Sequence, residues 1–483
     1  MRALFAFTRD LRLGDHAGLA AAARYGDVVP VLVLDSASAA RLRSSPRRAA
    51  AYCAAVAALD AALRARGCAL VVRRGSMGAA LRALARATGA HAVAWSCGYD
   101  ARTMRRDRSV QSTLEEAGLR ALTIHDLPAV PPEDAALSGR RGDGYRAFAP
   151  YFARWQTEIA AQDAGSAAFA AHELGSEPLP VPAEFGATDA APCEPAGEAA
   201  ARAKLETFLS GPALQYGVAR NVPAAAETSH LSAELSLGTI AAREVVRRTT
   251  ERIADPFLLA EERASLRLYL KALAQRDFFL QLAWYNESLT EEPLQRKMRG
   301  FTFARTHALL DAWRVGRTGF PLVDAGMREL RATGRMHPRI RAVAASFLCF
   351  DLGVDWRVGR DVWDRWLVED EPALAAGNWQ WVAAVGADLA AYPRIYNPLK
   401  QARRFDPAAR YVRRWIPELA AFPDAAILDP LAAHRERQLQ LALFAAEGYP
   451  APILDHERAA RAFLRRYAHE VGAEKAAGET TLR

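Results

Sequence analysis

The chain has 483 residues, of which 51% are apolar and 24% are charged, which is the ordinary balance of a globular protein with enough apolar residues for a core. Its formal net charge of +8 favours a polyanionic partner, such as a nucleic acid. The five cysteines include no CxxC pair and no run of about twenty apolar residues occurs, so we expect neither disulfide bonds, nor a metal site, nor a membrane span.

The first 126 residues alternate short apolar runs with helix-period stretches. The apolar runs are Ala3–Phe7, Val28–Leu34, Ala69–Val72, Ala92–Trp95 and Ala121–Ile124. Alanine-rich stretches such as Arg47–Arg66 and Ala101–Glu116 lie between them and have helical spacing. Strands that are apolar throughout are buried on both faces, and helical crossovers connect parallel strands. The pattern therefore predicts an α/β domain with a doubly wound, Rossmann-like parallel sheet.

The periodic pattern ends between residues 127 and 200. Residues 138–144 are rich in glycine, and five prolines follow, at Pro178, Pro180, Pro182, Pro192 and Pro195. Proline interrupts both helices and central strands, so we predict a long connector here. From residue 201 onward amphipathic segments of helical period dominate, which predicts an all-α second domain with a short polar tail after Val471.

A cluster of small hydroxyl side chains marks the start of a predicted helix. Tyr216 lies in the segment QYGVARN, and Thr228-Ser-His-Leu-Ser232 follows Pro223. Such hydroxyls can cap the free N–H groups of a helix, and the helix dipole also attracts an anion. From these residues alone, plain capping and anion binding both remain open.

The segment from residue 378 to 415 combines aromatic and basic side chains. Trp379 and Trp381 open it, and residues 391–415 contain one Lys and six Arg against the single acid Asp406. The aromatic residues among these cations are Tyr392, Tyr396, Phe405, Tyr411 and Trp415. Cations contact phosphates and rings stack on bases, so the pattern indicates a nucleic-acid groove. A solvated arginine-rich helix with ordinary core aromatics is the alternative.

Blocks of this sequence resemble the cryptochrome/DNA photolyase family. They are FTRDLRLGDHAGL (7–19), TGFPLVDAGMREL (318–330), ASFLCFDLGVDWRVG (345–359), NWQWVAAVGAD (378–388) and RIYNPLKQARRFDPAARYVRRW (394–415). The resemblance covers nearly the whole chain in the family's order. It implies an α/β antenna domain over residues 1–126, a connector over 127–200 and a helical FAD-binding domain over 201–483. We expect a monomeric cytoplasmic protein.

The resemblance implies that FAD is the cofactor. The positions that match the family's FAD contacts are Tyr216, Thr228, Ser229, Leu231, Ser232, Arg276, Arg341, Glu369, Glu371 and Ala375. Several positions depart from the family pattern, because His230 replaces an arginine, and Glu369 and Glu371 stand where the family usually has aspartates. Ala375 replaces the side chain that faces flavin N5, which is Asn in repair enzymes. An arginine–carboxylate pair between Arg341 and Glu369 is also implied.

The family's photoexcited flavin receives electrons through a chain of tryptophans. Trp379 and Trp356 match its two inner members, and these two residues are our candidates for catalytic electron transfer. The outermost member is replaced by Phe303, which is much harder to oxidise. The rings that could replace it are Trp313, Trp363 and Trp366.

The positions that hold a lesion in repair enzymes are largely substituted. A Glu and, three residues later, a Trp hold a cyclobutane dimer in the family; here they are Ala272 and Gln275. The other substitutions are Arg335 for a Trp, Pro338 for an Asn and Ala342 for a Met, and neither histidine used for (6-4) photoproducts is present. Trp381 remains as a wall for a flipped base, so we expect weak repair of either lesion.

DNA and a light-harvesting molecule are the further implied ligands. We expect DNA, duplex or single-stranded, to contact Gln275 and Trp381 and the cations Arg394, Lys400, Arg403 and Arg404 by electrostatic attraction. The family's antenna is a folate or a deazaflavin, and its identity here is open. The residues near the family's antenna positions are Arg47, Arg48, Cys97, Asp100 and Arg105.

Three functions therefore stay open. The first is a light-driven flavoenzyme acting on damaged DNA, which would be a deoxyribodipyrimidine photolyase, a carbon–carbon lyase. The second is a cryptochrome-like photoreceptor without repair, favoured by Ala272 and Gln275. The third is a DNA-binding protein with a weakened flavin site, favoured by Arg335, Glu369 and Ala375.

Overall fold

A computed structural model describes most of the chain, and its contacts form two compact units. The residues outside the described part are 134–136, 140–141, 160–163, 166, 189–194, 226, 306–307, 388–391, 432–437, 441, 444, 446–447 and 472–483. The predicted polar tail after Val471 lies outside it. The first unit, here called the sheet unit, contains Met1–Gly217, Thr228–Thr290 and Val368–Leu374. The second, the helical unit, contains Val218–Glu227, Glu291–Leu367 and Ala375–Arg483.

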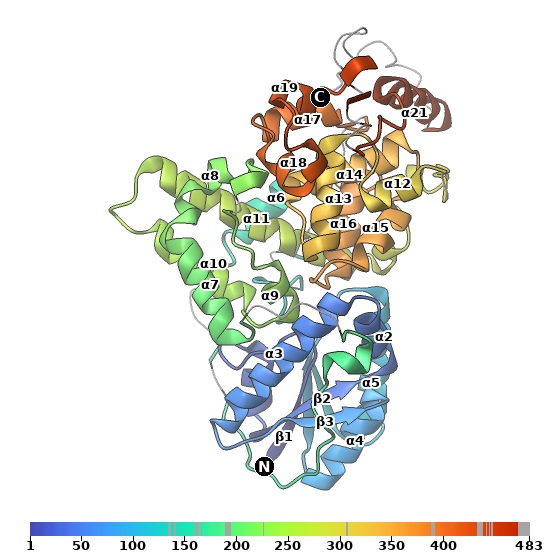
Figure 1. Cartoon of the computed structure of the whole chain (residues 1–483). Coiled ribbons are helices and arrows are strands. Elements are labelled where there is room, and N and C mark those ends of the chain that lie inside the picture. The colour runs from blue at the N-terminus through green and yellow to red at the C-terminus, as the bar shows by residue number, and fades with distance from the viewer. Residues whose placement is uncertain are drawn as a thin grey trace. The chain divides into compact units, whose positions relative to one another are not determined.

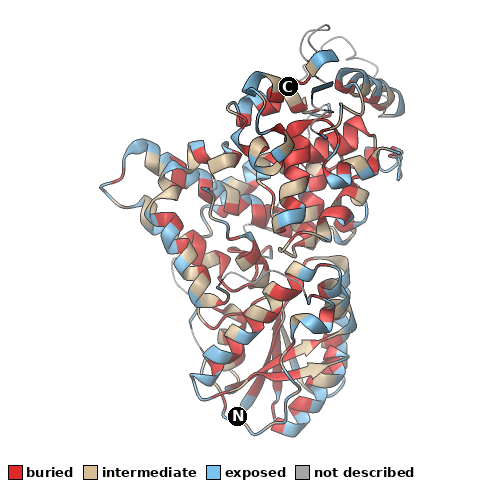
Figure 2. Ribbon diagram, in the orientation of Figure 1, coloured by how far each residue is buried: buried red, intermediate tan, exposed pale blue. Residues whose placement is uncertain are grey.

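The sheet unit contains a five-stranded sheet in the order β3-β2-β1-β4-β5, with all neighbouring strands parallel (Figure 1). The strands are β1 Arg2–Phe7, β2 Asp27–Leu34, β3 Val71–Arg74, β4 Ala92–Ser96 and β5 Arg120–Ile124. Central β1 pairs with both β2 and β4, and every residue of β1 after Arg2 is buried (Figure 2). The predicted doubly wound fold is confirmed.

Side chains alternate between the two faces of a strand, and those of β1 are apolar on both faces. Helices therefore cover both faces of the sheet. Phe5 and Phe7 of β1 share one apolar cluster with residues of α1 (Ala17–Ala23) and α3 (Pro46–Arg64). Leu4 shares the other with residues of α4 (Met77–Thr88) and α5 (Ala101–Glu115). Each face therefore has its own core.

The sheet unit also contains helices from the central part of the chain. They are α6 Phe148–Trp155, α7 Glu198–Ser210, α9 Ser232–Leu237, α10 Ala242–Ile253 and α11 Ala260–Tyr285. The buried carboxylate of Asp277 on α11 accepts hydrogen bonds from the Ala129 N–H at 2.8 Å and from Nε1 of Trp155 at 3.0 Å. Burial raises the pKa of Asp277, and these donors oppose that rise. The connector is thereby held against α11.

The helical unit packs its helices around a core rich in tryptophan. Its main elements are α12 Leu310–Val315, α13 Pro321–Thr333, α14 Pro338–Ser346, α15 Trp356–Asp364, α16 Pro372–Val382, α17 Pro398–Phe405, α18 Arg410–Trp415, α19 Asp424–Leu428 and α21 His456–Val471. Proline stands in the first turn of α13, α14 and α17, where its missing N–H is not needed. Within the described residues, no helix combines the length and the apolar character needed to cross a membrane.

Candidate functional site

The hydroxyl cluster before α9 is not used for capping. The N-cap of α9 is Leu231, and no side chain caps that N-terminus in the described structure. The side chains of Thr228 and Ser229 are half-buried and that of Ser232 is exposed. With only six residues, α9 has few aligned peptide dipoles. Capping therefore does not explain these hydroxyls, and any anion contact here would rest on the hydroxyls more than on the dipole.

Tyr216 is held beside this cluster by other rings. Its ring packs edge-to-face against Tyr269 of α11, with centroids 5.4 Å apart, and against Phe208 of α7 at 6.2 Å. The N–H of Gly217 donates to Oγ of Ser265 at 3.2 Å, which fixes the backbone next to Tyr216 on α11. Rigid packing of this kind is what a ligand contact needs.

A buried ion cluster joins Arg276 to Glu371. Arg276 is 9% exposed, donates to the carbonyl of Leu127 at 2.9 Å, and lies 3.5 Å from a carboxylate oxygen of Glu371. Glu371 also forms an ion pair with Arg9. Both ion pairs fall on Oε1 of Glu371, whereas Oε2 is buried and has no hydrogen-bond partner among the described residues. A buried carboxylate normally has hydrogen-bond donors, so the residues present fit a bound ligand that supplies N–H or O–H groups.

The other predicted cofactor positions divide between the two units. Glu369 belongs to the sheet unit, and its carbonyl accepts from Arg48 at 3.4 Å. Arg341 belongs to the helical unit and donates from Nε to the carbonyl of Met336 at 2.8 Å. The pair of Arg341 with Glu369 thus stays a prediction. Ala375 is half-buried and is the first residue of α16 in the helical unit.

Two of the substituted lesion positions, Ala272 and Gln275, lie on one side of α11, whereas Arg335, Pro338 and Ala342 belong to the helical unit. Gln275 is exposed and Ala272, one turn earlier, is half-buried, whereas Arg276 and Asp277 are buried. Residues three apart are neighbours on a helix surface. Trp381 is half-buried and packs against the core of the helical unit. Its neighbour Gln380 is fully buried and anchors α16 by accepting from the Leu294 N–H at 2.8 Å.

Tryptophan rings of the helical unit form a continuous group. The ring of Trp379 lies 4.4 Å, centroid to centroid, from Trp363, and Trp363 lies 6.2 Å from Trp313 with the planes 15° apart. A Cβ added to Gly359 of α15 would lie 2.3 Å from the Trp379 ring, so this ring rests directly on α15. Trp356 begins α15, three residues before Gly359, and Trp363 follows four residues after it. Trp356 and Trp363 are therefore each about one helical turn from the point where the Trp379 ring meets Gly359.

Trp356, the second predicted relay residue, and Phe303, at the position of the family's outermost member, have different surroundings. Trp356 is fully buried, and the guanidinium groups of Arg357 and Arg360 lie over its ring at 5.6 and 5.3 Å from the centroid. Phe303 packs against Phe301, with centroids 4.8 Å apart. The contact of Trp363 with Trp379 was not predicted, although the glycine between two tryptophans on α15 is a readable signal of it.

The basic run of residues 394–414 forms an exposed cationic surface with few exposed rings. Its single acid, Asp406, is turned inward and accepts from the N–H groups of Tyr411 and Val412 at 3.0 and 2.9 Å. Phe405 and Tyr411 are buried, so for these two rings the alternative of ordinary core aromatics holds. The exposed cations are Arg394, Lys400, Arg403, Arg404, Arg410 and Arg414.

Two cations of this run are engaged with acids. Arg403 forms an ion pair with Asp429, and Arg413 lies 2.6 Å from a carboxylate oxygen of Asp424. These two charges are partly neutralised, so we expect the other exposed cations to contribute more to the attraction of phosphates.

The residues near the expected antenna positions have structural partners in the sheet unit. Asp100 is the N-cap of α5, and its carboxylate accepts from the backbone of the first turn. Sγ of Cys97 lies 3.3 Å from Nδ1 of His125. Arg48 is buried and donates to the carbonyl of Glu369. Because these side chains already have partners within the protein, their positions do not indicate an antenna ligand.

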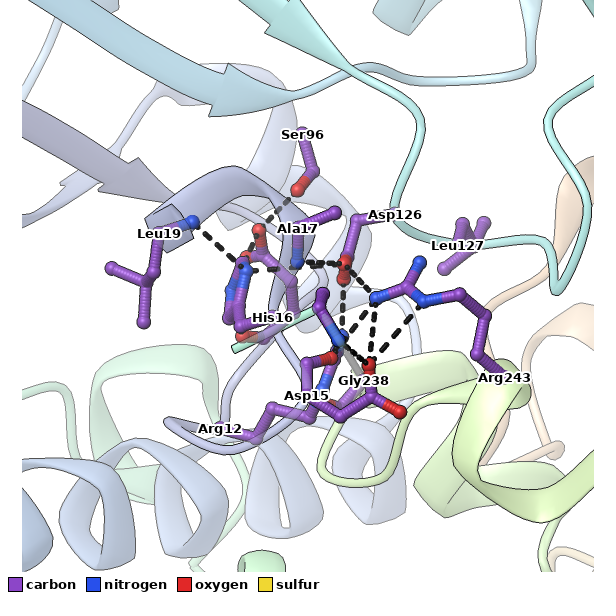
Figure 3. Close-up of polar contacts among 12 residues, drawn as sticks. Arg12, Asp15, His16, Ala17, Leu19, Ser96, Asp126, Leu127, Gly238 and Arg243 are labelled. Carbon is purple, nitrogen blue, oxygen red and sulfur yellow. Dashed lines mark hydrogen bonds and ion pairs between the residues drawn. The ribbon is translucent and has the colours of Figure 1, made fainter. Parts of the chain in front are cut away.

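A second buried ion cluster joins the sheet to α10 (Figure 3). Ligand atoms of Asp10, His16 and Asp126 lie within 4.8 Å of one another, as in a possible metal site. Asp126, however, already accepts from Arg12 at 2.7 Å and from Arg243 of α10 at 3.0 Å. Two guanidinium charges would repel a cation, so the cluster is an internally neutralised ion network.

The same network should stabilise the sheet unit at neutral pH. Burial raises the pKa of Asp126, but the charges of Arg12, His16 and Arg243 outweigh this and hold the pKa well below its usual range. A carboxyl with a depressed pKa contributes stability that is present above its unfolded pKa of about 4 and is lost as the pH falls through the lower folded value.

Arg243→Met should therefore lower the free energy of unfolding at pH 7 by about 2–4 kcal/mol, because it removes one of the two guanidinium partners of a buried carboxylate. Urea unfolding monitored by circular dichroism measures the change. Arg247→Met is the matched control, since Arg247 lies one turn later on α10 and pairs with the exposed Glu251. Equal stability of the two variants would contradict a role of the network.

Two family models match the chain. Residues 3–175 match the model described as DNA photolyase, and residues 269–469 match the FAD binding domain of DNA photolyase. The chain is 35% identical over 474 residues to a deoxyribodipyrimidine photo-lyase of Halobacterium salinarum, and the alignment covers 94% of this chain and 96% of that protein.

Solved structures agree with these matches. A bacterial class III photolyase from Agrobacterium tumefaciens superposes with a TM-score of 0.80 and 30% identity, over 97% of each chain. An archaeal photolyase from Sulfolobus tokodaii, solved with two FAD molecules, gives a TM-score of 0.81 and 26% identity over 97% of this chain and all of that one.

Proposed function

The chain belongs to the cryptochrome/DNA photolyase family and carries its FAD-binding domain, and from this we propose that it is a blue-light-driven flavoprotein that acts on DNA with weak lesion selectivity. The observation that carries the proposal is the two-sided character of α11. Its buried side presents Arg276 beside the buried carboxylate of Glu371, and its accessible side carries Ala272 and Gln275. One helix would thus serve both the cofactor and the DNA.

Bound FAD would supply photoexcitation and one-electron transfer. We assign the hydroxyls of Thr228, Ser229 and Ser232 to hydrogen bonds with its diphosphate, and Arg276 to its negative charge. Glu371 would accept from ligand N–H or O–H groups through Oε2, which is buried and has no hydrogen-bond partner among the described residues. Tyr216 would pack against the ligand, supported by Tyr269.

Removing two of these hydroxyls should weaken FAD binding. Thr228→Val with Ser232→Ala deletes two hydrogen bonds to a charged group, which predicts a dissociation constant raised by about a hundredfold. Calorimetric titration of apoprotein with FAD measures it. Thr207→Val is the control, because Thr207 is exposed on α7 and bonds only within its helix. Unchanged affinity in the double variant would remove the hydroxyl cluster from the site.

DNA binding should depend steeply on salt. If about three cations of the 394–414 run meet phosphates, the logarithm of affinity should fall against the logarithm of salt with a slope near −3 on duplex DNA. The Lys400→Ala, Arg404→Ala, Arg410→Ala variant should flatten this slope. Arg403→Ala should change it less, because Arg403 is paired with Asp429. A triple variant with unchanged binding would place the DNA elsewhere.

A cryptochrome-like photoreceptor without repair is the second candidate. The absence of a carboxylate at Ala272 and of a ring at exposed Gln275 favours it. Blue light applied to the protein with ultraviolet-damaged oligonucleotide separates the two functions, because only the first restores intact pyrimidines. Failure of purified protein to hold or take up FAD would instead favour a DNA-binding protein with a weakened flavin site.

A further inference from the structure

The short acidic segment Glu369–Glu371, which precedes α16, is tied to the sheet unit at each residue. The carbonyl of Glu369 accepts from Arg48 at 3.4 Å. The N–H of Asp370 donates to Oγ of Ser236 at 2.7 Å. Glu371 forms ion pairs with two arginines, Arg9 and Arg276. By contacts, the segment groups with the sheet, although α16 continues into the helical unit from Ala375.

Asp370 is the residue of this segment whose side chain has no predicted contact with the cofactor. Its carboxylate forms an ion pair with Arg41 of α2 (Ser36–Arg43), through Nε at 3.5 Å and through a closer contact of Nη2. The side chains are 28% and 23% exposed, so solvent screens this pair only in part. Burial raises the pKa of Asp370, but the charges of Arg41, Arg48 and Arg9 outweigh burial and keep it well below its usual range. Asp370 is therefore a fixed negative charge at neutral pH.

The three arginines come from the β1–β2 side of the α/β fold. Arg9 follows β1, Arg41 lies on α2 after β2, and Arg48 lies in the first turn of α3. Arg9 also donates from Nε to the carbonyl of Ser236 at 3.3 Å, so the acidic segment, Ser236 and the loop after β1 form one connected group. A connected polar group of this kind fixes its members in one arrangement.

We propose that Asp370 is a positioning residue for the flavin: its pair with Arg41 holds the Glu369–Glu371 segment in place, so that flavin affinity depends on an arginine of the α/β part of the chain. The inference rests on the proposed flavin role of Glu369 and Glu371. Carboxylates that meet a ligand must be held within about half an ångström of their productive position by the residues behind them. Glu371 in particular has one carboxylate oxygen beside Arg9 and Arg276 and the other buried without a hydrogen-bond partner among the described residues, so a shift of its backbone changes what it can contact.

Charge-removing variants on each side of the pair test this inference. Asp370→Asn and Arg41→Gln should each raise the FAD dissociation constant of the apoprotein by about tenfold, since each removes the ion pair that holds the segment. The double variant should be no weaker than either single variant, because both remove the same interaction. Asp370→Glu, which keeps the charge, should retain most of the affinity. Arg43→Gln is the matched control, as Arg43 is exposed on the same helix.

Two further readouts separate positioning from general destabilisation. The thermal midpoint of each apoprotein, followed by circular dichroism, reports folding alone. The fine structure of the visible absorption bands of bound flavin reports its immediate surroundings, and it should change in Asp370→Asn but not in Arg43→Gln. If wild-type protein binds FAD and both Asp370→Asn and Arg41→Gln bind it equally well, the inference is overturned. Additive losses in the double variant would overturn it too, while absence of FAD binding by the wild type would refute the proposed function itself.

Discussion

The Ala272→Glu, Gln275→Trp double variant should bind ultraviolet-damaged DNA at least about tenfold more selectively over intact DNA than the unmodified protein does. The full contribution of the two groups is larger. Base–aromatic stacking contributes about 1–3 kcal/mol and a charge-assisted hydrogen bond about 1.5–3 kcal/mol, which together correspond to about two to four orders of magnitude. The gain in selectivity should therefore lie between about tenfold and this full contribution, and cyclobutane-dimer repair under blue light should be faster.

The position of these residues on α11 makes the variant feasible. Gln275 is exposed and Ala272 is half-buried, so larger side chains require no rearrangement of the core. The residues on the buried side of the same turn, Arg276 and Asp277, keep their partners. Flipping a base out of the duplex costs a few kcal/mol, which a stacking ring and a hydrogen-bonding carboxylate would offset.

A second pair of sites on the same helix gives the control. Ala264→Glu with Leu268→Trp adds the same two groups at exposed positions about two turns earlier. This variant should keep the selectivity of the unmodified protein, as measured by competition binding with damaged and intact oligonucleotides. If both variants gain the same selectivity for damaged DNA, the added side chains act anywhere on the surface, and no pocket at Ala272 and Gln275 is needed. Rapid repair by the unmodified protein would show that other residues, with Arg335 and Trp381 as the first candidates, hold the lesion.

The sequence predicted the sheet well because its signal is local. Runs such as Val28–Leu34 are apolar throughout, and a strand with this pattern is stable only when both faces are covered. The structure places β2 at Asp27–Leu34 and covers both sides of the sheet with helices. The grouping of residues 368–374 with this sheet was not predictable, since it depends on long-range pairs such as Arg41 with Asp370.

At the candidate site, residue identity was easier to predict than residue environment. The basic run indicated a cationic surface, but only tertiary packing decides that Phe405 and Tyr411 are buried and that Asp406 turns inward. Similarly, hydroxyls before a helix fit both capping and ligand binding, and the choice depends on the N-cap, which is Leu231. Side chains that can serve either core or ligand are ambiguous until their neighbours are known.

Trp363→Phe should slow light-driven reduction of the bound flavin more than Trp356→Phe does. Trp379, which we expect to be one of the two inner relay residues, contacts Trp363 at 4.4 Å between centroids, and Trp363 lies next to Trp313. A relay tryptophan carries a transient positive charge when it gives up its electron. The route through Trp363 and Trp313 should therefore take most of the electrons.

Electrostatics favours this route over Trp356. A unit charge 5.3 Å from the ring of Trp356, as Arg360 provides, disfavours a positive charge there by about 3 kcal/mol at an effective dielectric constant of about 20. Asp361, 3.0 Å from Arg360, offsets part of this. A remaining difference of about 1.4 kcal/mol corresponds to about a tenfold lower population of the charge on Trp356. The indole of Trp313 also favours this route. Its Nε1 donates to the carbonyl of Ala344 at 3.0 Å, and this acceptor stabilises a positive charge on the ring.

The rate of flavin reduction under constant blue light with an external thiol measures the effect. Trp366→Phe is the control, because Trp366 is only half-buried and its ring lies under Arg331 at 5.6 Å. If Trp356→Phe abolishes reduction and Trp363→Phe leaves it unchanged, the electrons pass through Trp356, as in the family. Gly359→Ala should slow reduction whichever route operates, since its new methyl group would displace the Trp379 ring from α15. Comparison of Trp363→Phe and Trp356→Phe with Gly359→Ala separates a changed electron route from a displaced Trp379 ring.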